Sequence, residues 1–253
     1  MNLEPAPTSS LVLFHYWRSS ASYRARIALN IKELHYEIQP VHLLEQGGQQ
    51  HHSGYRELNP QSLVPTLVHN GHAIGQSLAI IEYLDEVFPN HFLLPAEPLA
   101  RAKVRGIALY IASEGQPMMN LRVLQYLESQ HAFNEQAKAD WVRHWLSVNF
   151  QNIEQQLVAD AGTAFVSGEQ PGMIECCLVP HAFAAQRFNL DMSAYPTVNR
   201  IVADCLTLPA FIKAHPARQI DTPDEFRIAD ENCGLTRFMI VQIAVRIMFS
   251  IST

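Results

Sequence analysis

Serines crowd one junction near the start of the chain, where their hydroxyl groups could stabilise a negatively charged atom. The run Ser19-Ser20-Ala21-Ser22 lies between a short apolar run, Leu11 to Tyr16, and a stretch with helical spacing, Arg24 to Ile31. The first N–H groups of a helix lack intrahelical partners and form the positive end of its dipole, so hydroxyls there can orient an anion or a thiolate. Serine is also a common N-cap, and the local pattern alone favours a simple cap.

The segments on either side of this junction predict a βαβ unit. Leu11 to Tyr16 is short and apolar, as in a buried strand, and Tyr23 to Leu34 has helical spacing. His35 to Leu43 then returns to a strand-like composition. The serines would therefore lie where the first strand gives way to the first helix.

A ββα unit is predicted next. The strand-like runs Val64 to Val68 and Ala73-Ile74 are separated by Asn70-Gly71, a strong hairpin signal. A helix is expected from Ser77, as its cap, to Val87. The positions expected to be buried in this helix are Leu78, Ile81, Leu84 and Val87.

Pro65 opens one of these strands although it lacks the N–H that a ladder bond needs. A cis bond between Val64 and Pro65 would turn the Val64 N–H and C=O outward, where they could pair with an extended peptide ligand. An ordinary trans proline on an edge strand explains the same residues. The sequence leaves both possibilities open.

A change in composition divides the chain into two parts. Prolines and the loss of periodicity after Phe88 predict a linker over 91–98, after an α/β domain at 9–90. An all-helical domain is expected over 99–228, and 229–253 is a tail of unknown structure. Its apolar run, Phe238 to Phe249, is shorter than a membrane span and contains Arg246. The expected helical stretches are Leu99 to Gln130, Gln136 to Val158, Met173 to Phe188 and Pro196 to Leu208.

Composition narrows the classes of function. With 253 residues, 48% of them hydrophobic, the chain can bury a substantial core. A net charge of -6 argues against a nucleic-acid partner. The four cysteines have no CxxC or framework spacing, and the N-terminus has no signal pattern, so a cytoplasmic protein with reduced thiols and no transmembrane segment is expected. His51 and His52 lack a partner cluster with ligand spacing, so no metal is expected.

Several ordered motifs carry a more specific signal. Ser19 to Leu29 combines a serine-rich run, an aromatic residue and Arg-x-Arg-Ile-Ala-Leu. Further matching motifs are Glu45 to Gln50, Leu58-Asn59-Pro60, Val64 to Leu67, Gln76 to Leu84 and Asn120 to Leu124. Together they resemble the zeta class of glutathione transferases, whose members include maleylacetoacetate isomerases. The resemblance runs from about Leu11 to Glu225.

Two departures from the class pattern matter. Ala21 replaces the cysteine of the serine-rich motif, so no thiol of the chain lies there and the glutathione sulfur must be the nucleophile. Gly172 and Glu175 stand where the class more usually has a Ser/Thr-x-x-Asp capping box, which predicts a weaker cap. Cys176 and Cys177 follow at once and are expected to be inert core residues.

The resemblance implies a fold, a cofactor and a set of binding residues. The fold would be a thioredoxin-like βαβ-ββα domain followed by a helical bundle, assembled as a homodimer, and the cofactor would be glutathione. Ser19 would donate to the glutathione thiolate and lower the thiol pKa, with Ser20 beside it. The other residues implied to bind glutathione are Gln50, Val64, Gln76 and Ser77.

The reaction implied is the cis–trans isomerisation of maleylacetoacetate to fumarylacetoacetate, a step of tyrosine and other aromatic catabolism, by reversible addition of the thiolate. The substrate is a small dicarboxylate, so Arg18 and Arg187 are candidate carboxylate ligands, with Gln116 as a further pocket residue. Alternatives are a maleylpyruvate isomerase, a general zeta-class transferase acting on haloacids and, last, a non-catalytic binding protein.

Overall fold

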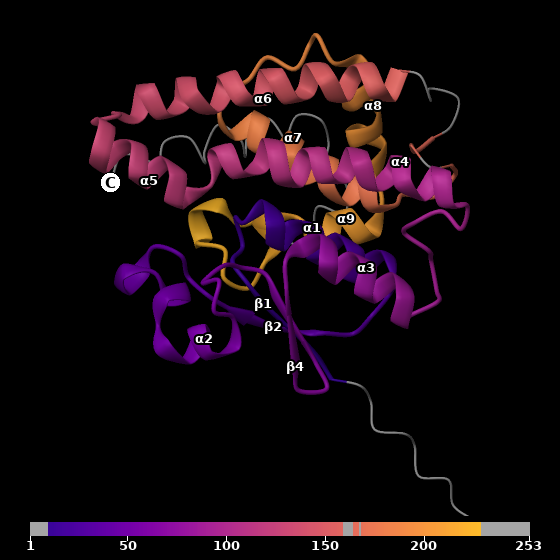
Figure 1. Cartoon of the computed structure of the whole chain (residues 1–253), viewed down its shortest axis with the longest axis horizontal. Helices are drawn as coiled ribbons and strands as arrows, with labels where there is room; N and C mark the ends of the chain where they lie inside the picture. The colour runs from indigo at the N-terminus through magenta and orange to yellow at the C-terminus, as the bar shows by residue number, and fades with distance from the viewer. Residues whose placement is uncertain (1–9, 159–163, 167, 229–253) are drawn as a thin grey trace, which may run out of the picture.

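The computed structural model describes residues 10–158, 164–166 and 168–228. The predicted tail at 229–253 lies outside the described residues. A small sheet with its helices forms one part of the molecule and long helices form the other (Figure 1). None of the described helices is long and apolar enough to cross a membrane.

The sheet confirms the predicted βαβ and hairpin units. Its four strands lie in the order β2-β1-β3-β4, with β1 parallel to β2 and the other pairs antiparallel. Helix α1 (Ser20–Ile31) connects the parallel pair, and Asn70 and Gly71 turn the hairpin with φ of 50° and 82°. The strand bounds are β1 Leu11–His15, β2 Glu37–Pro40, β3 Thr66–His69 and β4 His72–Gly75.

Helix α3 (Ser77–Val87) has the predicted bounds but not the predicted cap. Gln76 occupies the N-cap position with φ of 66°, whereas Ser77 is the first helical residue and its hydroxyl accepts a hydrogen bond from Arg24. The predicted buried face was also partly wrong, because Val87 is 43% exposed and Ile80 is fully buried. Helix α3 packs against α1, and its buried apolar residues are Ile80, Ile81 and Leu84.

The first predicted stretch of the helical part is broken in the structure. The predicted stretch Leu99 to Gln130 is interrupted by a π-helical segment, Tyr110–Gly115, and a 3-10 turn, Gln116–Met119. Pro117 explains the break, because it offers no N–H and its ring clashes with the preceding turn. The observed helices are α2 Ser53–Leu58 in the first part and then α4 Pro98–Leu109, α5 Leu121–His131, α6 Glu135–Val158, α7 Met173–Arg187, α8 Pro196–Cys205 and α9 Pro209–Ala214.

The short helix α9 was not predicted. It packs against α1, so the chain returns to the first domain after building the helical one. Two 3-10 turns, Pro216–Arg218 and Asp224–Phe226, extend this return. The segment 209–228 therefore lies beside the strand–helix junction that carries the serines.

The start of α7 is held by an acidic side chain rather than by a hydroxyl cap. The buried carboxylate of Glu175 accepts hydrogen bonds from the N–H groups of Gly172 and Val166, at 2.7 and 2.8 Å. Gly172 has no side chain to complete the capping box, and a Cβ there would lie 2.7 Å from the Leu93 carbonyl oxygen. Close approach of the two backbones therefore explains the glycine. The predicted burial of Cys176 and Cys177 is confirmed, and burial raises the pKa of the Cys177 thiol to about 11.

Replacing Gly115 by alanine should destabilise the fold. A Cβ at Gly115 would collide with the Asn149 side chain and would lie 3.1 Å from the His181 ring. Overpacking of this kind costs about 1–3 kcal/mol, which thermal unfolding would detect. Gly106→Ala is the matched control, because nothing lies within 4 Å of its Cβ position. Inside helix α4 this alanine should instead stabilise by about 0.5–1 kcal/mol, so equal melting temperatures for the two variants would contradict the prediction.

Two buried histidines should make the protein sensitive to acid. Burial lowers the pKa of both His181 and His215 to about 3, with Arg24 and Arg26 adding to the effect. In the unfolded chain histidine has a pKa of about 6.5, so below that pH the unfolded state binds protons that the native state does not. The free energy of unfolding therefore falls as the pH drops from about 6.5 toward 3.

At pH 5 each histidine should have removed about 2 kcal/mol from the free energy of unfolding. Urea titrations at pH 7 and pH 5 would measure the loss. His181→Leu should reduce the difference between the two pH values, whereas His72→Gln, at an exposed position on β4, should not. An undiminished pH dependence in His181→Leu would refute the assignment.

Candidate active site

One cavity of about 390 Å³ lies between the two parts of the molecule and brings the predicted site residues together. The first domain contributes the serine-rich junction, the loop before β3 and the start of α3, and the helical part contributes the interrupted region after α4 and the end of α7. Every predicted site residue lines it: Arg18, Ser19, Ser20, Gln50, Val64, Gln76, Ser77, Gln116 and Arg187.

Ser19 caps α1 and still has a proton to donate. Its Oγ accepts a hydrogen bond from the Ser22 N–H at 3.2 Å, so the simple cap exists. Among the described residues no acceptor takes the Ser19 hydroxyl proton. The same hydroxyl can therefore satisfy the helix and donate toward the cavity. Ser20 is the first helical residue and lines the cavity beside it.

The Val64–Pro65 peptide bond is cis. Val64 is 9% exposed, and within the described part of the chain neither its N–H nor its C=O has a hydrogen-bond partner. Buried backbone groups are normally paired. The free pair at the cavity wall is suited to an extended peptide that supplies both a donor and an acceptor.

Gln50, Gln76 and Ser77 form a polar side of the cavity. Gln50 is 7% exposed and its Oε1 is buried without a partner. Gln76 donates from Nε2 to the Gln61 Oε1 at 2.6 Å. Ser77 lies in the first turn of α3, where the free N–H groups favour an anion such as a carboxylate. These groups fit the amide, amine and carboxylate functions of glutathione.

Arg24 is a site residue that the sequence interpretation did not assign. It is 3% exposed and donates from Nη1 to Ser77 Oγ at 3.0 Å and from Nη2 to Gln116 Oε1 at 3.3 Å. It thereby joins both parts of the chain at the cavity wall. Its signal was present in the sequence, because a charged residue stood among the buried positions of a helix. Tyr16 and Arg122 also line the cavity and were missed.

The described residues that line the cavity carry positive charge. They include Arg18, Arg24, Arg122 and Arg187 but neither aspartate nor glutamate. Burial, and then the neighbouring Arg18, lower the pKa of Arg187 to about 9, so this arginine is still charged at neutral pH. Its Nε is buried without a partner. Cations so placed favour an anionic ligand, and guanidinium groups suit carboxylates.

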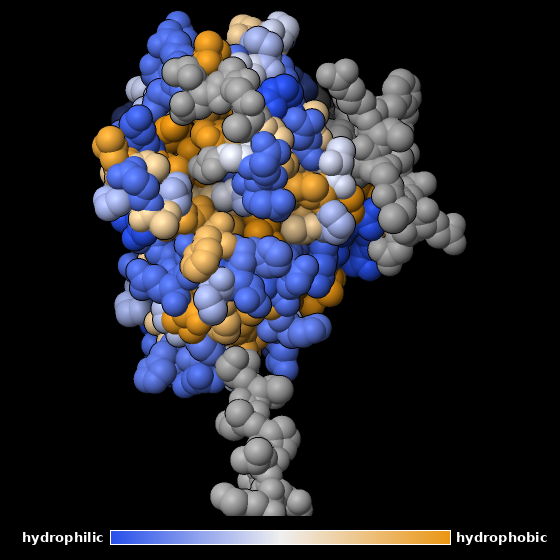
Figure 2. All heavy atoms as spheres, turned by 90° about the vertical axis from the view of Figure 1, so that its right-hand side faces the viewer, coloured by the Kyte–Doolittle hydropathy of each residue, from blue (hydrophilic) through white to orange (hydrophobic). Residues whose placement is uncertain are grey.

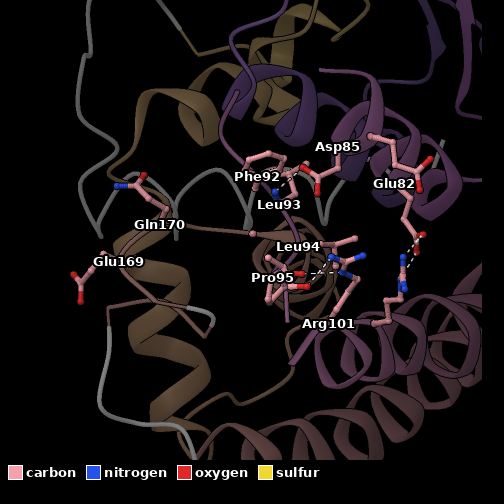
Figure 3. A pocket seen from close by; sticks show the side chains of 13 residues that line it. Glu82, Asp85, Phe92, Leu93, Leu94, Pro95, Arg101, Glu169 and Gln170 are labelled. Atoms are coloured by element: carbon pink, nitrogen blue, oxygen red, sulfur yellow. Dashed lines mark hydrogen bonds and ion pairs between the residues drawn. The ribbon is translucent and has the colours of Figure 1, made fainter. Parts of the chain in front are cut away.

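A second cavity, of about 550 Å³, lies between α3 and α4 and contains none of the predicted site residues (Figure 3). Four of its charged groups, Glu82, Asp85, Arg101 and Arg105, pair with other side chains or with the backbone. Arg105 binds Glu82 through two hydrogen bonds, and Arg101 donates to the Pro95 and Ala96 carbonyls. Asp85 accepts from the Leu93 N–H and pairs with Lys32. These contacts hold the connection between the two parts and leave the cationic cavity as the candidate site.

Comparisons with known proteins agree with this geometry. The family model of the glutathione S-transferase N-terminal domain matches residues 18–87. A probable maleylacetoacetate isomerase of Vibrio cholerae is 47% identical over 212 residues, which cover 84% of this chain and 98% of the relative.

Solved structures give the same result. The holo structure of a bacterial maleylpyruvate isomerase, a zeta-class glutathione S-transferase, has a TM-score of 0.81 at 37% identity and covers 84% of this chain and 100% of its own. The maleylacetoacetate isomerase of Methylobacterium extorquens, crystallised with malonate and glutathione, has a TM-score of 0.79 at 35% identity and covers 84% and 99%.

The fold is therefore that of a glutathione transferase, with a thioredoxin-like first domain. Its first domain contains the four-stranded sheet and the cis-proline loop, and its helical part closes the cationic cavity. Within that fold the relatives narrow the assignment. The chain belongs to the zeta-class family of the maleylacetoacetate isomerases.

Proposed function

We propose that this chain is a glutathione-dependent isomerase that converts maleylacetoacetate to fumarylacetoacetate. The observation that carries the proposal is the cavity itself. Among the described residues it combines a serine hydroxyl at a helix N-terminus, an unpaired backbone N–H and C=O at Val64, and four arginines with no carboxylate. The relatives named above support the substrate, and the neighbouring structure with glutathione and malonate supports a thiol peptide beside a dicarboxylate.

The chemistry divides between the cofactor and the chain. Glutathione, when bound, would supply the thiolate for reversible addition to the cis double bond, which allows rotation about that bond. Ser19 donates a hydrogen bond to the sulfur, and the N-terminus of α1 favours its negative charge, so the thiol ionises more readily near neutral pH. Ser20 adds a second hydroxyl beside the sulfur.

The remaining residues hold the two ligands. The Val64 backbone pairs with the cysteinyl part of glutathione, Gln76 and Ser77 hold its γ-glutamyl end, and Gln50 reaches it from the loop. Arg24 braces Ser77 and adds positive charge behind it. On the substrate side Arg18 and Arg187 bind carboxylates, with Gln116 beside them.

The test is an isomerisation assay on the purified chain with maleylacetoacetate, with and without glutathione. Formation of the trans product without net consumption of glutathione is the expected result. Maleylpyruvate is the second candidate substrate, because the neighbour with a TM-score of 0.81 is a maleylpyruvate isomerase. Activity on maleylpyruvate alone would move the assignment to that substrate, and isomerisation of neither would refute the function.

We infer further that the protein is a cytoplasmic homodimer. Buried free thiols at Cys176, Cys177 and Cys205 support a reducing compartment. Apolar surface is visible among hydrophilic residues on the side that carries the linker (Figure 2). Exposed apolar side chains on α3, α4 and α5 also support a partner surface: Val87, Leu99, Leu109 and Tyr126.

Size-exclusion chromatography with light scattering would test the assembly. A mass near twice 28.5 kDa is expected. A single-chain mass at micromolar concentration would refute the homodimer without touching the isomerase proposal. The domain limits at 9–90 and 99–228, with the linker between them, are proposed on the interval between the end of α3 and the start of α4.

A further inference from the structure

Residues 16–19 form a turn that carries Arg18 and Ser19, and we call it the catalytic turn. It is held by hydrogen bonds to side chains that do not line the cavity. The turn is closed by a hydrogen bond from the Ser19 N–H to the Tyr16 carbonyl at 3.0 Å. Between them, the Trp17 N–H donates to Asp221 Oδ2 at 2.8 Å, and the Trp17 carbonyl accepts from Arg26 Nη2 at 3.0 Å. Both peptide groups of Trp17 are therefore fixed from outside the turn.

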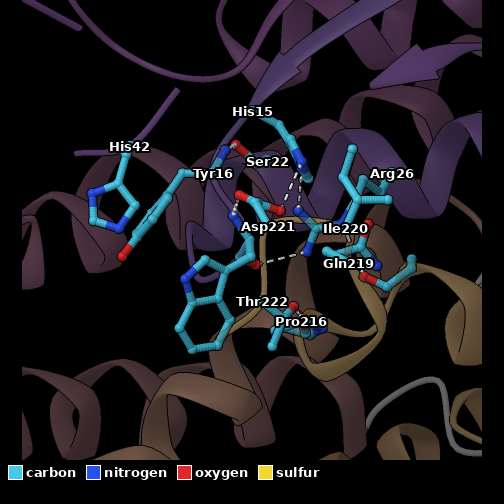
Figure 4. Close-up of polar contacts among 12 residues, drawn as sticks. His15, Tyr16, Ser22, Arg26, His42, Pro216, Gln219, Ile220, Asp221 and Thr222 are labelled. Atoms are coloured by element: carbon cyan, nitrogen blue, oxygen red, sulfur yellow. Dashed lines mark hydrogen bonds and ion pairs between the residues drawn. The ribbon is translucent and has the colours of Figure 1, made fainter. Parts of the chain in front are cut away.

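The side chains that hold this turn belong to one cluster of His15, Arg26 and Asp221 (Figure 4). Arg26 Nη1 lies 3.0 Å from His15 Nδ1, and His15 Nε2 lies 3.2 Å from Asp221 Oδ1 in an electrostatic contact. Arg26 also donates from Nε to the Ala214 carbonyl at 2.9 Å. His15 and Arg26 are fully buried.

The donors and acceptors of this cluster leave His15 one arrangement. Arginine only donates, so His15 Nδ1 must accept from Arg26, and the ring proton must lie on Nε2, facing Asp221. Burial alone would raise the pKa of Asp221, but His15 and the Trp17 N–H hold that pKa below its usual value. Asp221 is therefore a carboxylate with one oxygen for Trp17 and the other for His15.

The segment that carries Asp221 is itself held by hydrogen bonds. Gln219 donates to the Lys213 and His215 carbonyls, and Thr222 donates to the Pro216 carbonyl. Farther along, the Phe226 ring stacks on the Trp17 indole with centroids 5.5 Å apart. Arg18, the next residue of the turn, places its guanidinium carbon 5.5 Å from the centre of the same indole.

We propose that Asp221 is a positioning residue for the catalytic turn: by fixing the Trp17 peptide together with Arg26, it sets where Arg18 and Ser19 stand in the cavity. The inference rests on the proposed function for the meaning of that turn. Asp221 does not touch the cavity, so its effect passes through Trp17. Ångström-scale displacement of a reacting group is enough to change a rate greatly.

Asp221→Asn is the test, because it keeps the shape of the side chain and changes one hydrogen-bond role. An asparagine oxygen can still accept from Trp17, but its NH₂ group then faces the Nε2–H of His15. Moving the ring proton to Nδ1 only transfers the conflict to Arg26. Asp224→Asn is the matched control, since Asp224 lies in the same segment with a side chain 97% exposed.

Three measurements separate positioning from a merely structural role. We expect Asp221→Asn to lower kcat by about 10- to 100-fold, as loss of a group that orients an active-site residue does. The KM for glutathione should change little, because the residues that hold its backbone lie elsewhere. The pKa of the bound glutathione thiol, followed by its ultraviolet absorbance against pH, should rise. Asp224→Asn should match the unchanged protein in all three.

A double variant sharpens the test. If Asp221 acts through the turn, Asp221→Asn should lower kcat much less in the Ser19→Ala background than in the unchanged protein. Additive losses, or an unchanged kcat and thiol pKa in folded Asp221→Asn, would overturn the proposal. Should Asp221→Asn fail to fold, Phe226→Leu disturbs the same tryptophan through its ring, and an unchanged kcat there would overturn it equally. The thiol titration needs glutathione alone, so it stands even if the substrate assignment fails.

Discussion

Ser19→Ala is expected to reduce kcat by about 10²- to 10³-fold, the loss seen when one donor to a developing or resting anion is removed from a preorganised site. The Ser19 hydroxyl caps the N-terminus of α1 and lines the cavity, and no described residue accepts its proton. Without it the pKa of the bound glutathione thiol should rise, and steady-state kinetics with a pH titration of thiolate absorbance would show both changes. The loss of the cap should also cost about 1 kcal/mol of stability.

Ser19→Asp separates the cap from the chemistry. Aspartate caps helices as well as serine does, so this variant should melt like the unchanged protein. Its negative charge next to the sulfur should nevertheless disfavour the thiolate and abolish most of the activity. Ser20→Ala should lose less than Ser19→Ala. If Ser19→Asp kept full activity, Ser19 would be a cap only, and a larger loss in Ser20→Ala would transfer the role to Ser20.

Arg187→Leu is expected to raise the KM for the dicarboxylate substrate by about 10- to 100-fold, the worth of a hydrogen-bonded contact with a charged group. Glutathione binding should be little affected, because Gln76, Ser77 and Val64 hold that ligand. Arg187 has no hydrogen-bond acceptor among the described residues, and its Nε is buried. Removing an uncompensated cation should therefore leave the melting temperature unchanged or higher, even as activity falls.

Arg122→Leu is the control for this experiment. Arg122 also lines the cavity and carries the same charge, but its side chain is exposed to solvent at the rim. Arg122→Leu should therefore raise the substrate KM much less than Arg187→Leu does. Arg187→Lys should restore part of the affinity, because lysine supplies charge without the two-pronged geometry. Equal KM values for Arg187→Leu and Arg122→Leu would mean that the cavity attracts anions only through its overall charge.

The sequence predicted helices and strands correctly where the spacing of apolar residues and the residues at the turns or caps indicated the same element. Helix α3 was placed from Ser77 to Val87, and the hairpin at Asn70-Gly71, because each carries its own signal. The break after Leu109 was missed although Gly115 and Pro117 stood in the stretch, because the flanking residues kept a helical period. Helix α9 has only six residues and too little periodicity to detect.

The site was predictable where a residue's role depends on its own backbone, and unpredictable where it depends on a distant partner. Ser19 and Val64 lie at positions that a strand, a turn and a proline define locally. The cis state of Val64–Pro65 depends on tertiary context, so the sequence left it open. The direction of the Arg24 side chain and the contact of Trp17 with Asp221, 204 residues away, have no local signature.

The return of the chain to its first domain has a consequence for synthesis. All the residues that line the cavity have been made once Arg187 is added, yet the Trp17 N–H finds its carboxylate only when Asp221 leaves the ribosome. Synthesis proceeds at about 5–20 residues per second. For some seconds the nascent protein therefore has every residue that lines the cavity, while the Trp17 N–H still lacks its hydrogen bond to Asp221. On this view the thiol of bound glutathione is fully activated only after Asp221 has emerged, so a chain that stops short of Asp221 should bind glutathione but ionise its thiol less readily.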